Sequence, residues 1–595
     1  MTNLIYQDDT HSDPKRRAEH LLQEARPYFE ERWRCYQRAF RFYKGDQWTQ
    51  AEVRAFYQQH RKNYVFNEVA SKVDHLMGVQ RRTRTAPVVR SRSPEQAHMA
   101  DAMTDRLDVI MDLSDCEYVE SDVFLDSLLA GYGAAAVRVD TEVSGNIRID
   151  RIPPYEVVWD GTATDRALTG ARWLARSSVQ PRQLAAERFP GFAHIIQRGG
   201  QGGLDELSVT PEPPQLWRRP RHDEVRIIEF YERTKVRVWQ VTDEIAGTTE
   251  RFNTKAAAED YHKGLITGYT LEGALVFDAD GTSLIRTNEG TRNTIWQILI
   301  IGGELVLHRE TSLPAFPYII NFCNFHDGHF WAFVDQLIDP QILINRYITQ
   351  WDYQLGTSVR NAVTVMESLL RRGWKTEDVR RELSKTSPVL PVLSHGAVGT
   401  INGKSPDPAL FQGVDMAMNR MVDYSGGRNY LGLTENAAES GRAVSERINA
   451  SSLARYALWD NLRLFRRRLF TLVLWYELCL TTGDAPESLD AMELTISLEE
   501  TAATDSQRER EFSQMKELLQ SLGGPPEVAI KVMIELSSLS QSRKDELLSM
   551  LTFHQQYAQQ QASKEEDAGI QRSVTKSLKR AALKHQMQTT GMPGP

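Results

Sequence analysis

The feature that most constrains the fold is a stretch near the N-terminus that lies between two predicted helices. Residues 42–48 read FYKGDQW, in which the Gly-Asp pair is typical of a tight turn and the Trp is a large aromatic anchor. Residues 65–66 then form a short apolar entry, and Asn67 suits the N-cap of a second helix. No side chain here is arranged for catalysis, so the stretch predicts a structural element rather than an active site.

Size and charge limit the classes of protein to which the chain belongs. Its 595 residues suggest roughly three to four domain-sized pieces. With 41% hydrophobic and 25% charged residues, the composition is that of a protein with packed cores. The net charge of -8 argues against a surface that grips duplex DNA by neutralising phosphates, because such surfaces are basic. It leaves room for a protein past which DNA slides.

Cysteine spacing and apolar runs bear on the compartment. The four cysteines are far apart and form no CxxC pair, which disfavours a disulfide framework or a zinc site and fits a reducing cytosol. Residues 1–15 are polar and contain no apolar segment of a secretory signal. The run at residues 469–480 is 12 residues long and contains Glu477, so it predicts a buried helix. We therefore expect no signal peptide and no transmembrane segment.

Hydrophobic periodicity predicts helices followed by a β-hairpin in the N-terminal part. Apolar residues recur at three- and four-residue spacing over residues 15–60, after Asn67, and over residues 95–131. The period then changes to two over residues 135–140 and 147–150, with a Ser-Gly-Asn turn between them. The change of period predicts that helices give way to a hairpin at this point.

The rest of the chain alternates between strand-rich and helical segments. Residues 199–221 are rich in Gly and Pro and are predicted to form a linker. Residues 223–320 are strand-rich and are expected to form a self-contained α+β insertion. Residues 331–370 predict a long helix in which Pro340 marks either a kink or the true start. Further helices are predicted over residues 407–480 and 505–565.

No pattern in the chain predicts catalysis. It contains no HExxH, no GxSxG and no phosphate-binding Walker A motif, so a DNA motor would have to be another protein. His326 and His329 are better explained as residues of a loop than as metal ligands, and the acidic residues 278–281 lack the spacing of an EF-hand. We predict no catalytic residue, no metal site and no cofactor.

Two basic clusters are candidates for contact with DNA or with another subunit. The first is an arginine triplet inside a predicted helix, where three consecutive residues fan over roughly 200°. At least one of them is therefore expected to face a partner or the interior, and ion pairs within or between chains are the alternative to DNA contact. The triplet is Arg466, Arg467 and Arg468, and the second cluster is a basic helical face made by Lys576, Lys579 and Arg580.

A set of short motifs occurs in a specific order along the chain. Their residues are Gly45, Asp46, Gln47, Trp48, Asn67, Pro153, Asp160, Asp335 and Pro340. In this order the motifs resemble those of the portal proteins of P22-like short-tailed bacteriophages. The resemblance covers about residues 20–500 of the chain.

This resemblance implies an α+β, predominantly helical portal-type protomer that assembles into a ring, typically of twelve subunits. The ring would occupy one capsid vertex of the virion, after assembly in the host cytoplasm. Double-stranded DNA would enter through it, driven by the terminase large subunit, and would leave through it at infection. A tail adaptor protein and the scaffolding and major capsid proteins are the other implied partners.

The resemblance also implies a division into domains. The implied parts are an N-terminal wing over 1–200, a linker or stem approach over 201–222, a strand-rich clip over 223–320, a stem helix over 321–360, a wing part with a tunnel-lining segment and a long helix over 361–500, a helical crown over 501–555, and a short tail or helical barrel over 556–595.

An acidic channel wall would repel phosphate and let DNA slide. The channel-lining candidates, for which a plain surface loop is the alternative, are Glu435, Asn436, Glu439 and Ser440. Four tryptophans are predicted to serve either the core, which is favoured for each, or contacts between subunits: Trp48, Trp351, Trp459 and Trp475. A structural scaffold of the virion without a channel, or a DNA-processing enzyme with clustered acidic metal ligands, remains as an alternative function.

Overall fold

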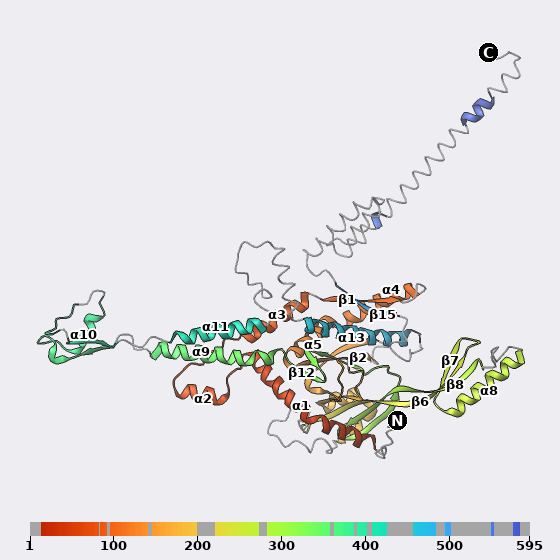
Figure 1. Cartoon of the computed structure of the whole chain (residues 1–595), viewed down its shortest axis with the longest axis horizontal. Coiled ribbons are helices and arrows are strands. Elements are labelled where there is room, and N and C mark those ends of the chain that lie inside the picture. The colour runs from red at the N-terminus through yellow and green to blue at the C-terminus, as the bar shows by residue number, and fades with distance from the viewer. Residues whose placement is uncertain are drawn as a thin grey trace, which may run out of the picture. The chain divides into compact units, whose positions relative to one another are not determined.

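The computed structural model describes two units of the chain. The described residues are 13–82, 84–91, 96–140, 146–198, 220–272, 283–357, 362–385, 389–394, 396–401, 407–424, 456–482, 494–500, 549–551 and 575–582. The first unit comprises Met1–Arg81 and Pro87–Glu499, and Figure 1 labels many of its helices and strands. The second comprises Arg82–Ala86 and Glu500–Pro595, in which residues 575–582 are helical.

The first helices form where the periodicity predicts them. They are α1 (Pro14–Lys44), α2 (Gln50–Gln58) and α3 (Glu68–Arg82). The Asp13 carboxylate caps the start of α1 by accepting a hydrogen bond from the Lys15 N–H at 3.0 Å. The helix ends at Gly45, whose φ of 92° is the left-handed conformation common at helix ends. The turn predicted after residue 44 is therefore confirmed.

Two further helices and a three-stranded sheet follow. They are α4 (Ala97–Leu113), α5 (Cys116–Ala130), and the antiparallel strands β10 (Tyr318–Phe322), β2 (Tyr132–Asp140) and β3 (Asn146–Ile152), in that spatial order. The predicted hairpin is confirmed as β2–β3. α5 lies so close to β2 that a Cβ on Gly133 would come within 2.1 Å of the Val123 carbonyl oxygen. Only glycine fits at this contact.

Most strands within residues 223–320 belong to a six-stranded antiparallel sheet that also includes earlier strands, so the prediction of a self-contained insertion is wrong. The sheet contains β4 (Val157–Trp159), β5 (Trp173–Pro181), β6 (Glu224–Asp243), β7 (Thr248–Phe252), β8 (Ile285–Ile301) and β9 (Glu304–Thr311). The first half of β6 pairs with β5, from Glu224↔Pro181 to Glu232↔Trp173. Residues 223–320 are strand-rich as predicted, but they are not self-contained, because they continue a sheet that begins at β4.

The far half of β6 and β8 forms a ribbon with a small core of its own. The two strands stay paired from Thr234↔Thr294 to Asp243↔Ile285, beyond the reach of β5. α8 (Lys255–Glu272) packs on this ribbon through Ala258, which is fully buried with Val241 and Ile285. The helix predicted within this segment is confirmed.

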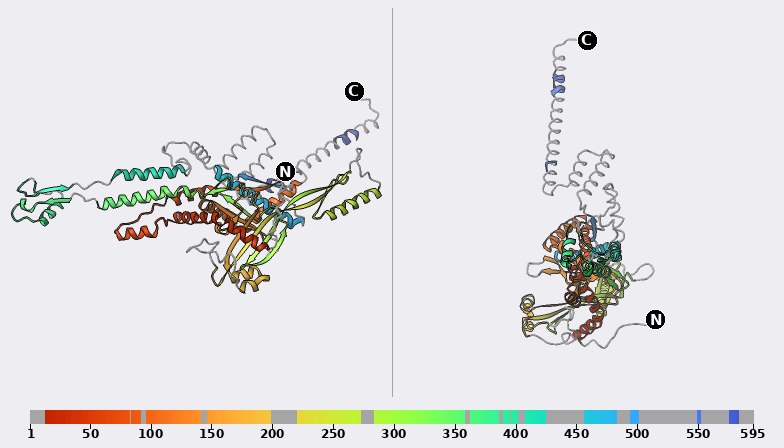
Figure 2. Two further views of the ribbon diagram at one scale, coloured as in Figure 1. Left: turned by 60° about the horizontal axis from the view of Figure 1, so that its bottom comes forward. Right: turned by 90° about the vertical axis from the view of Figure 1, so that its left-hand side faces the viewer.

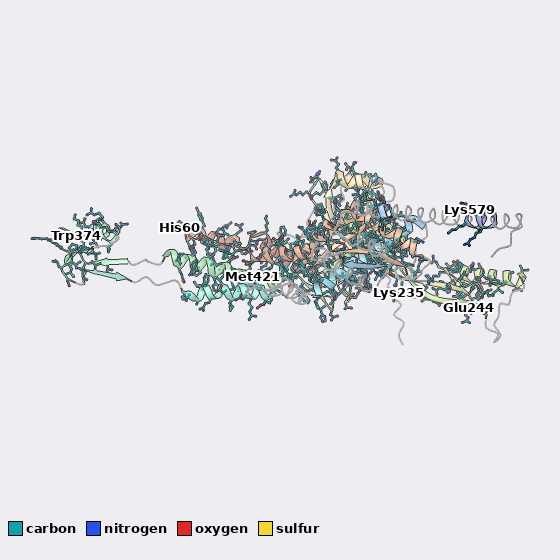
Figure 3. All side chains as sticks on the ribbon, turned by 90° about the horizontal axis from the view of Figure 1, so that it is seen from above. His60, Lys235, Glu244, Trp374, Met421 and Lys579 are labelled. Carbon is teal, nitrogen blue, oxygen red and sulfur yellow. The ribbon has the colours of Figure 1, made fainter. Side chains whose placement is uncertain are left out.

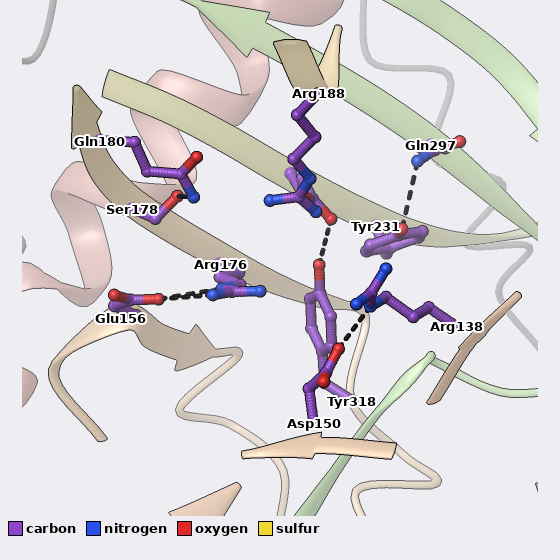
Figure 4. A network of polar contacts seen from close by, with 11 residues as sticks. Arg138, Asp150, Glu156, Arg176, Ser178, Gln180, Arg188, Tyr231, Gln297 and Tyr318 are labelled. Carbon is purple, nitrogen blue, oxygen red and sulfur yellow. Dashed lines mark hydrogen bonds and ion pairs between the residues drawn. The ribbon is translucent and has the colours of Figure 1, made fainter. Parts of the chain in front are cut away.

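A polar network joins the two sheets. The Tyr318 hydroxyl on β10 donates a hydrogen bond to the Glu229 carboxylate on β6, and Arg188 contacts the other oxygen of Glu229 at 3.1 Å (Figure 4). Nearby, Arg176 of β5 pairs with Glu156 at 2.9 Å. Burial and the neighbouring Glu229 raise the pKa of Tyr318 well above its usual value, so its hydroxyl keeps its proton and can donate.

The long helix expected over residues 331–370 is shorter at both ends. A tight hairpin, β11 (Asn324–His326) with β12 (His329–Trp331), and a 3₁₀ turn at Val334–Gln336 precede it. α9 then spans Ile338–Thr357, and a strand, β13 (Ala362–Val365), follows. Pro340 therefore marks the true start of α9, because a proline in the first helical turn loses no hydrogen bond.

α9 and α11 (Pro408–Tyr424) form an antiparallel helical hairpin (Figures 1 and 2). The Asp407 N–H, just before α11, donates to the Gln354 side chain near the end of α9 at 3.1 Å. Further along, the rings of Trp351 and Phe411 lie 6.2 Å apart. Met421, labelled in Figure 3, is fully buried on the inner face of α11.

A small module lies in the sequence between these two helices. It contains β13, the helix α10 (Thr376–Leu383) and β14 (Val398–Ile401). β13 and β14 pair from Ala362↔Ile401 to Val365↔Val398, so the chain leaves and re-enters the module side by side. Among its described residues, the buried apolar side chains are Val379 of α10, Leu370 and Ala397. Residues 362–401 thus form a small module inserted between the two helices of the hairpin.

α13 (Tyr456–Thr482) lies in the main core of the first unit. Leu469, Phe470, Leu472 and Val473 are fully buried in this core, where α13 packs chiefly on β10 and β2 and also contacts α4. The prediction that residues 469–480 are a buried helix is confirmed. β15 (Leu494–Glu500) pairs with β1 (Thr85–Ser91) to complete the described elements of this region.

Candidate functional site

α9 carries a stripe of three buried polar side chains. Gln341, Asn345 and Thr349 are spaced by four residues, so they share one face of the helix, and their exposed fractions are 0%, 2% and 2%. They face the extended chain that precedes α3. The Phe66 N–H donates to Asn345 Oδ1 at 3.1 Å, and the Tyr64 N–H donates to Thr349 Oγ1 at 3.3 Å. Side chains of α9 thus satisfy backbone groups that have no strand partner.

The same stripe caps α3. Gln341 Oε1 accepts hydrogen bonds from the backbone N–H groups of Glu68 at 3.0 Å and Val69 at 3.2 Å. Asn67 Oδ1 accepts a third, from the Ala70 N–H at 3.2 Å, which confirms the predicted N-cap. The free N–H groups at the start of α3 are therefore held partly by its own cap and partly by α9.

Gln47 connects this stripe to the turn after α1. Its Oε1 accepts from Asn345 Nδ2 at 2.6 Å, and its Nε2 donates to Asn67 Oδ1 and to the Phe42 carbonyl, both at 2.9 Å. Asn67 Nδ2 in turn donates to the Tyr43 carbonyl at 2.8 Å. Such a buried network stabilises one arrangement strongly, because a single lost partner leaves several polar groups unsatisfied. We call the network of Gln47, Asn67, Gln341 and Asn345 the amide joint.

Trp48 and Asp46 hold the turn on either side of Gln47. Trp48 is 7% exposed, donates from Nε1 to the Tyr64 carbonyl at 3.0 Å, and meets the ring of Phe56 edge-on at 4.9 Å. Asp46 is exposed and pairs with Arg41 at 2.9 Å, and this hydrogen bond lowers the pKa of Asp46. Trp48 therefore serves the core, as its residue type predicted.

Asp335 attaches the start of α9 to α1. Its carboxylate pairs with Arg32 of α1 at 2.8 Å and accepts a hydrogen bond from the Ala332 N–H at 2.9 Å. Pro340 stands one turn further along, inside the first turn of α9. The motif residues around 335–340 thus fix where α9 begins, and the amide joint fixes its rotation.

Pro153 and Asp160 organise the loops of the six-stranded sheet. Pro153 immediately precedes the 3₁₀ turn at Pro154–Glu156. Asp160 is 2% exposed and accepts hydrogen bonds from the backbone and side chains of Thr162 and Arg172. Burial alone would raise the pKa of Asp160, but these hydrogen bonds outweigh it and hold the pKa below the usual value.

The arginine triplet on α13 divides among three surroundings. Arg466 is 5% exposed, and its Nε donates to the buried Glu120 carboxylate at 2.9 Å. Arg468 is half-buried and donates to the Ala167 carbonyl. Arg467 is exposed. Arg466 is thus the residue of the triplet that faces the interior, as expected, and its charge is paired there with Glu120; contact of the triplet with DNA or with another subunit stays a prediction.

The remaining predicted site residues lie elsewhere. The channel-lining candidates Glu435, Asn436, Glu439 and Ser440 fall outside the described residues. The tail candidates are exposed on the helical stretch 575–582 of the second unit, where Figure 3 labels one of them, and they are Lys576, Lys579 and Arg580. Their three- and four-residue spacing places them on one face of that helix, as predicted.

The outer side of the α9–α11 hairpin exposes large apolar side chains. On α9, Leu343, Trp351 and Leu355 are 38%, 37% and 38% exposed and are spaced by multiples of four residues. Phe411 of α11, next to Trp351, is 57% exposed. We call these four residues the hairpin apolar surface. Exposed aromatic and aliphatic groups of this kind mark interaction sites more often than isolated apolar residues do.

Trp351 departs from the core role favoured for each tryptophan. Trp475 is 2% exposed and Trp459 stacks on the buried Phe124 with ring centres 5.5 Å apart, so both serve the core. Trp351 does not, because its position lies on the outward face of α9. The amide joint itself was not predicted, although a polar stripe at four-residue spacing on an apolar helix is visible in the sequence.

The described residues show no constellation for metal chemistry or membrane insertion. In the ranges that the structure covers, no group of three or more His, Cys, Asp or Glu side chains is placed to hold a metal ion. Among the described helices, none has both the length and the apolar character needed to cross a membrane. The motif residues instead make structural contacts within the fold.

Fold and site together define a structural protein whose motif residues position helices. The family model described as Phage P22-like portal protein matches residues 20–477. This match covers most of the chain, so the chain belongs to the family of P22-like phage portal proteins. Proteins of this family are structural head-to-tail connectors of phage particles. No curated protein matches the chain.

Proposed function

We propose that this chain assembles into a closed ring, typically of twelve subunits, at one capsid vertex. DNA would enter the head through the ring, driven by a separate terminase ATPase, and would leave through it at infection. The ring would also bind the tail adaptor. The observation that carries the proposal is the hairpin apolar surface on a member of the portal family.

A closed ring needs contacts between two different surfaces of neighbouring subunits. Such interfaces are centred on buried aromatic and aliphatic anchors. Trp351 and Phe411 are large, adjacent and partly exposed in the single chain. We assign them to the contact between neighbouring subunits, where their apolar area would be removed from water.

The course of the chain favours a revised domain assignment. The helical hairpin α9–α11 suits the stem, because the chain runs out along one helix and returns along the other. The module at residues 362–401 then suits the clip. Residues 223–320 suit the wing instead, since β6 continues the sheet that begins at β4.

The channel wall remains assigned to the segment around Glu435 and Glu439. Carboxylates there would repel the phosphates of passing DNA. Replacing both residues with lysine is expected to impair packaging while rings still form. Normal packaging by the double variant would remove these residues from the channel.

Electron-microscopy class averages of the purified full-length protein test the ring. The expected result is closed rings with a central hole wide enough for a duplex of roughly 20 Å, set by the size of DNA with its grooves. Rings without a hole would favour the scaffold without a channel. Monomers at high protein concentration would contradict self-assembly into a ring.

A matched pair of variants tests the assigned interface. Leu355→Ser changes the hairpin apolar surface, and Leu184→Ser makes the same change at an exposed position on α6 (Arg182–Arg188). Leu355→Ser is expected to lower the fraction of protein in rings, and Leu184→Ser to leave it unchanged. Equal ring fractions for both variants would contradict the assignment.

A further inference from the structure

Three arginines from distant parts of the sequence line one pocket. Arg166 lies in the loop between β4 and β5, Arg233 lies on β6, and Arg468 lies on α13. The pocket has a volume of about 30 Å³, and its other walls include Leu174 and Phe316. We call this the arginine pocket.

The guanidinium groups contact only neutral partners. Arg233 donates to the carbonyls of Thr169 and Ala171, and Arg468 donates to the Ala167 carbonyl. Arg166 donates to the Asn461 side chain at 3.1 Å. Each guanidinium has five N–H donors, so most of the donors in the pocket are not used by these contacts.

Among the described residues, no carboxylate forms an ion pair with any of the three arginines, and Asp165 is the one acidic group that acts on Arg233 and Arg468 from a longer distance. Within the described ranges, none of the three arginines has an Asp or Glu oxygen within ion-pair distance, unlike Arg176, which pairs with Glu156 (Figure 4), or Arg466, which pairs with Glu120. Asp165 lies in the same loop, but its oxygens accept hydrogen bonds from Thr169 and Gly170. The pocket therefore concentrates positive charge in a chain whose net charge is -8.

Electrostatics agree with an uncompensated cluster. Burial lowers the pKa of Arg468, Asp165 opposes this shift, and the nearby Arg233 and Arg467 add to it. Burial likewise lowers the pKa of Arg233, whose guanidinium also lies 4.6 Å over the ring of Phe316. For both arginines, burial outweighs the opposing effect of Asp165, so an anion bound in the pocket would stabilise the charged forms.

The loop that forms one wall is held in a single conformation. Leu168 has a φ of 50°, which is strained for a branched side chain, yet its side chain is 4% exposed. Asp160 and Arg172 close the base of the loop through hydrogen bonds. The arginines are thus attached to a fixed frame, and a preformed site loses little entropy on binding.

We propose that the arginine pocket binds a phosphate group, either free or in a DNA backbone. A volume of about 30 Å³ holds one or two water-sized atoms, so the pocket takes two oxygens of a tetrahedral ion. The other two oxygens stay outside, where they face solvent or continue as a phosphodiester. Three guanidiniums carry more charge than one carboxylate balances, which favours phosphate over an acidic side chain.

Thermal unfolding of the full-length protein in sodium phosphate tests the proposal, with sodium chloride and sodium acetate at equal ionic strength as references. Phosphate is expected to raise Tm more than either reference does, because an ion that binds only the folded state stabilises it. Equal Tm values in phosphate and chloride would overturn the proposal. Equal stabilisation by acetate would show a carboxylate site instead, and would overturn it too.

Variants locate the site. Titration calorimetry with phosphate is expected to show at least about tenfold weaker binding for Arg468→Gln and for Arg166→Gln. Arg166 is exposed, and within the described ranges its side chain hydrogen-bonds to Asn461 and forms no ion pair, so its replacement is expected to leave the fold intact. Arg467→Gln is the matched control, because Arg467 is exposed and does not line the pocket; it removes the same charge nearby and should weaken phosphate binding much less than either pocket variant does. Unchanged binding by both pocket variants would overturn the proposal.

Anisotropy of a short fluorescent DNA duplex identifies the source of the phosphate. If the pocket takes a backbone phosphate, Arg166→Gln weakens DNA binding and free phosphate competes with the duplex. If it takes free phosphate, the variants lose phosphate binding and the DNA signal does not change. Either result supports a phosphate site. If the variants keep both phosphate binding and DNA binding unchanged, the proposal is contradicted.

Discussion

α13 and α9 are two long helices of one chain whose surroundings differ. α13 is enclosed by the core, and its two buried charges are both paired: Arg466 with Glu120, and Glu477 with Arg106. α9 buries a polar stripe on one side and exposes Trp351 and Leu355 on another. The contrast supports the proposal that the outer face of α9 contacts a neighbouring subunit, whereas the buried charges of α13 are satisfied within a single chain.

The largest effect on the free energy of unfolding is expected from breaking the ion pair between Arg466 of α13 and Glu120. Glu120→Gln would leave Arg466 as a buried charge without its carboxylate, and should lower the free energy of unfolding by about 3–5 kcal/mol. Urea denaturation measures this. Asp122→Asn, which neutralises an exposed carboxylate on the same helix, should stay within about 0.5 kcal/mol. Equal effects of the two changes would mean that the pair does not stabilise α13.

The next effect concerns the inner face of α9. Gln341→Leu removes the acceptor for two N–H groups of α3 and the donor to the Phe66 carbonyl. The free energy of unfolding should fall by about 2–4 kcal/mol, because each unsatisfied buried group costs about 1–3 kcal/mol. Gln336→Ala, at an exposed position just before α9, is the control for the same denaturation experiment. A loss below about 1 kcal/mol would show that water replaces the amide joint.

Replacing Asp160 is expected to have a smaller effect on the free energy of unfolding than the Glu120 and Gln341 variants, and this effect should depend on pH. Its folded pKa lies below the ordinary value of 3.8, so its hydrogen bonds stabilise the fold above pH 3.8 and are lost as the pH falls through the folded pKa. Asp160→Asn should therefore cost about 1–3 kcal/mol at pH 7 and progressively less below pH 3.8. Unfolding curves at pH 7, 4 and 3 measure the difference. A cost that does not change with pH would point to lost geometry rather than lost charge.

The smallest effect on the single subunit is expected on the outer face of α9. Trp351→Phe should change the free energy of unfolding of dilute subunits by no more than about 1 kcal/mol, because the side chain is 37% exposed and the phenyl ring keeps most of its buried apolar area. The same change should reduce the population of rings seen by analytical ultracentrifugation. Strong destabilisation of dilute subunits would place Trp351 in the core and remove the contrast between the two helices.

Much of the local structure follows from short stretches of sequence. The turn at Gly45, the cap at Asn67, the β2–β3 hairpin and the buried run of α13 depend on neighbouring residues and on hydrophobic period, which the sequence displays directly. The family resemblance also rested on local motifs, and the match over residues 20–477 confirms it.

Errors arose where contacts join residues far apart in the chain. Residues 223–320 were expected to stand alone, but β6 is long enough to pair with β5 and then to extend beyond it. Strand content is visible in the sequence, whereas the choice of partner strand depends on tertiary packing. The helix over 331–370 was overextended for a related reason, since β13 is fixed by β14 more than thirty residues away.

By itself, the sequence determined the family, the α+β class, and local features such as the turn at Gly45 and the cap at Asn67, because periodicity, caps and turns act over a few residues. Only the tertiary structure decided which side chains meet. It paired Arg466 with Glu120, joined Gln47 to Asn345, and gathered Arg166, Arg233 and Arg468 around one pocket. These residues lie up to hundreds of positions apart, and their burial and charge depend on neighbours that no short stretch of sequence contains.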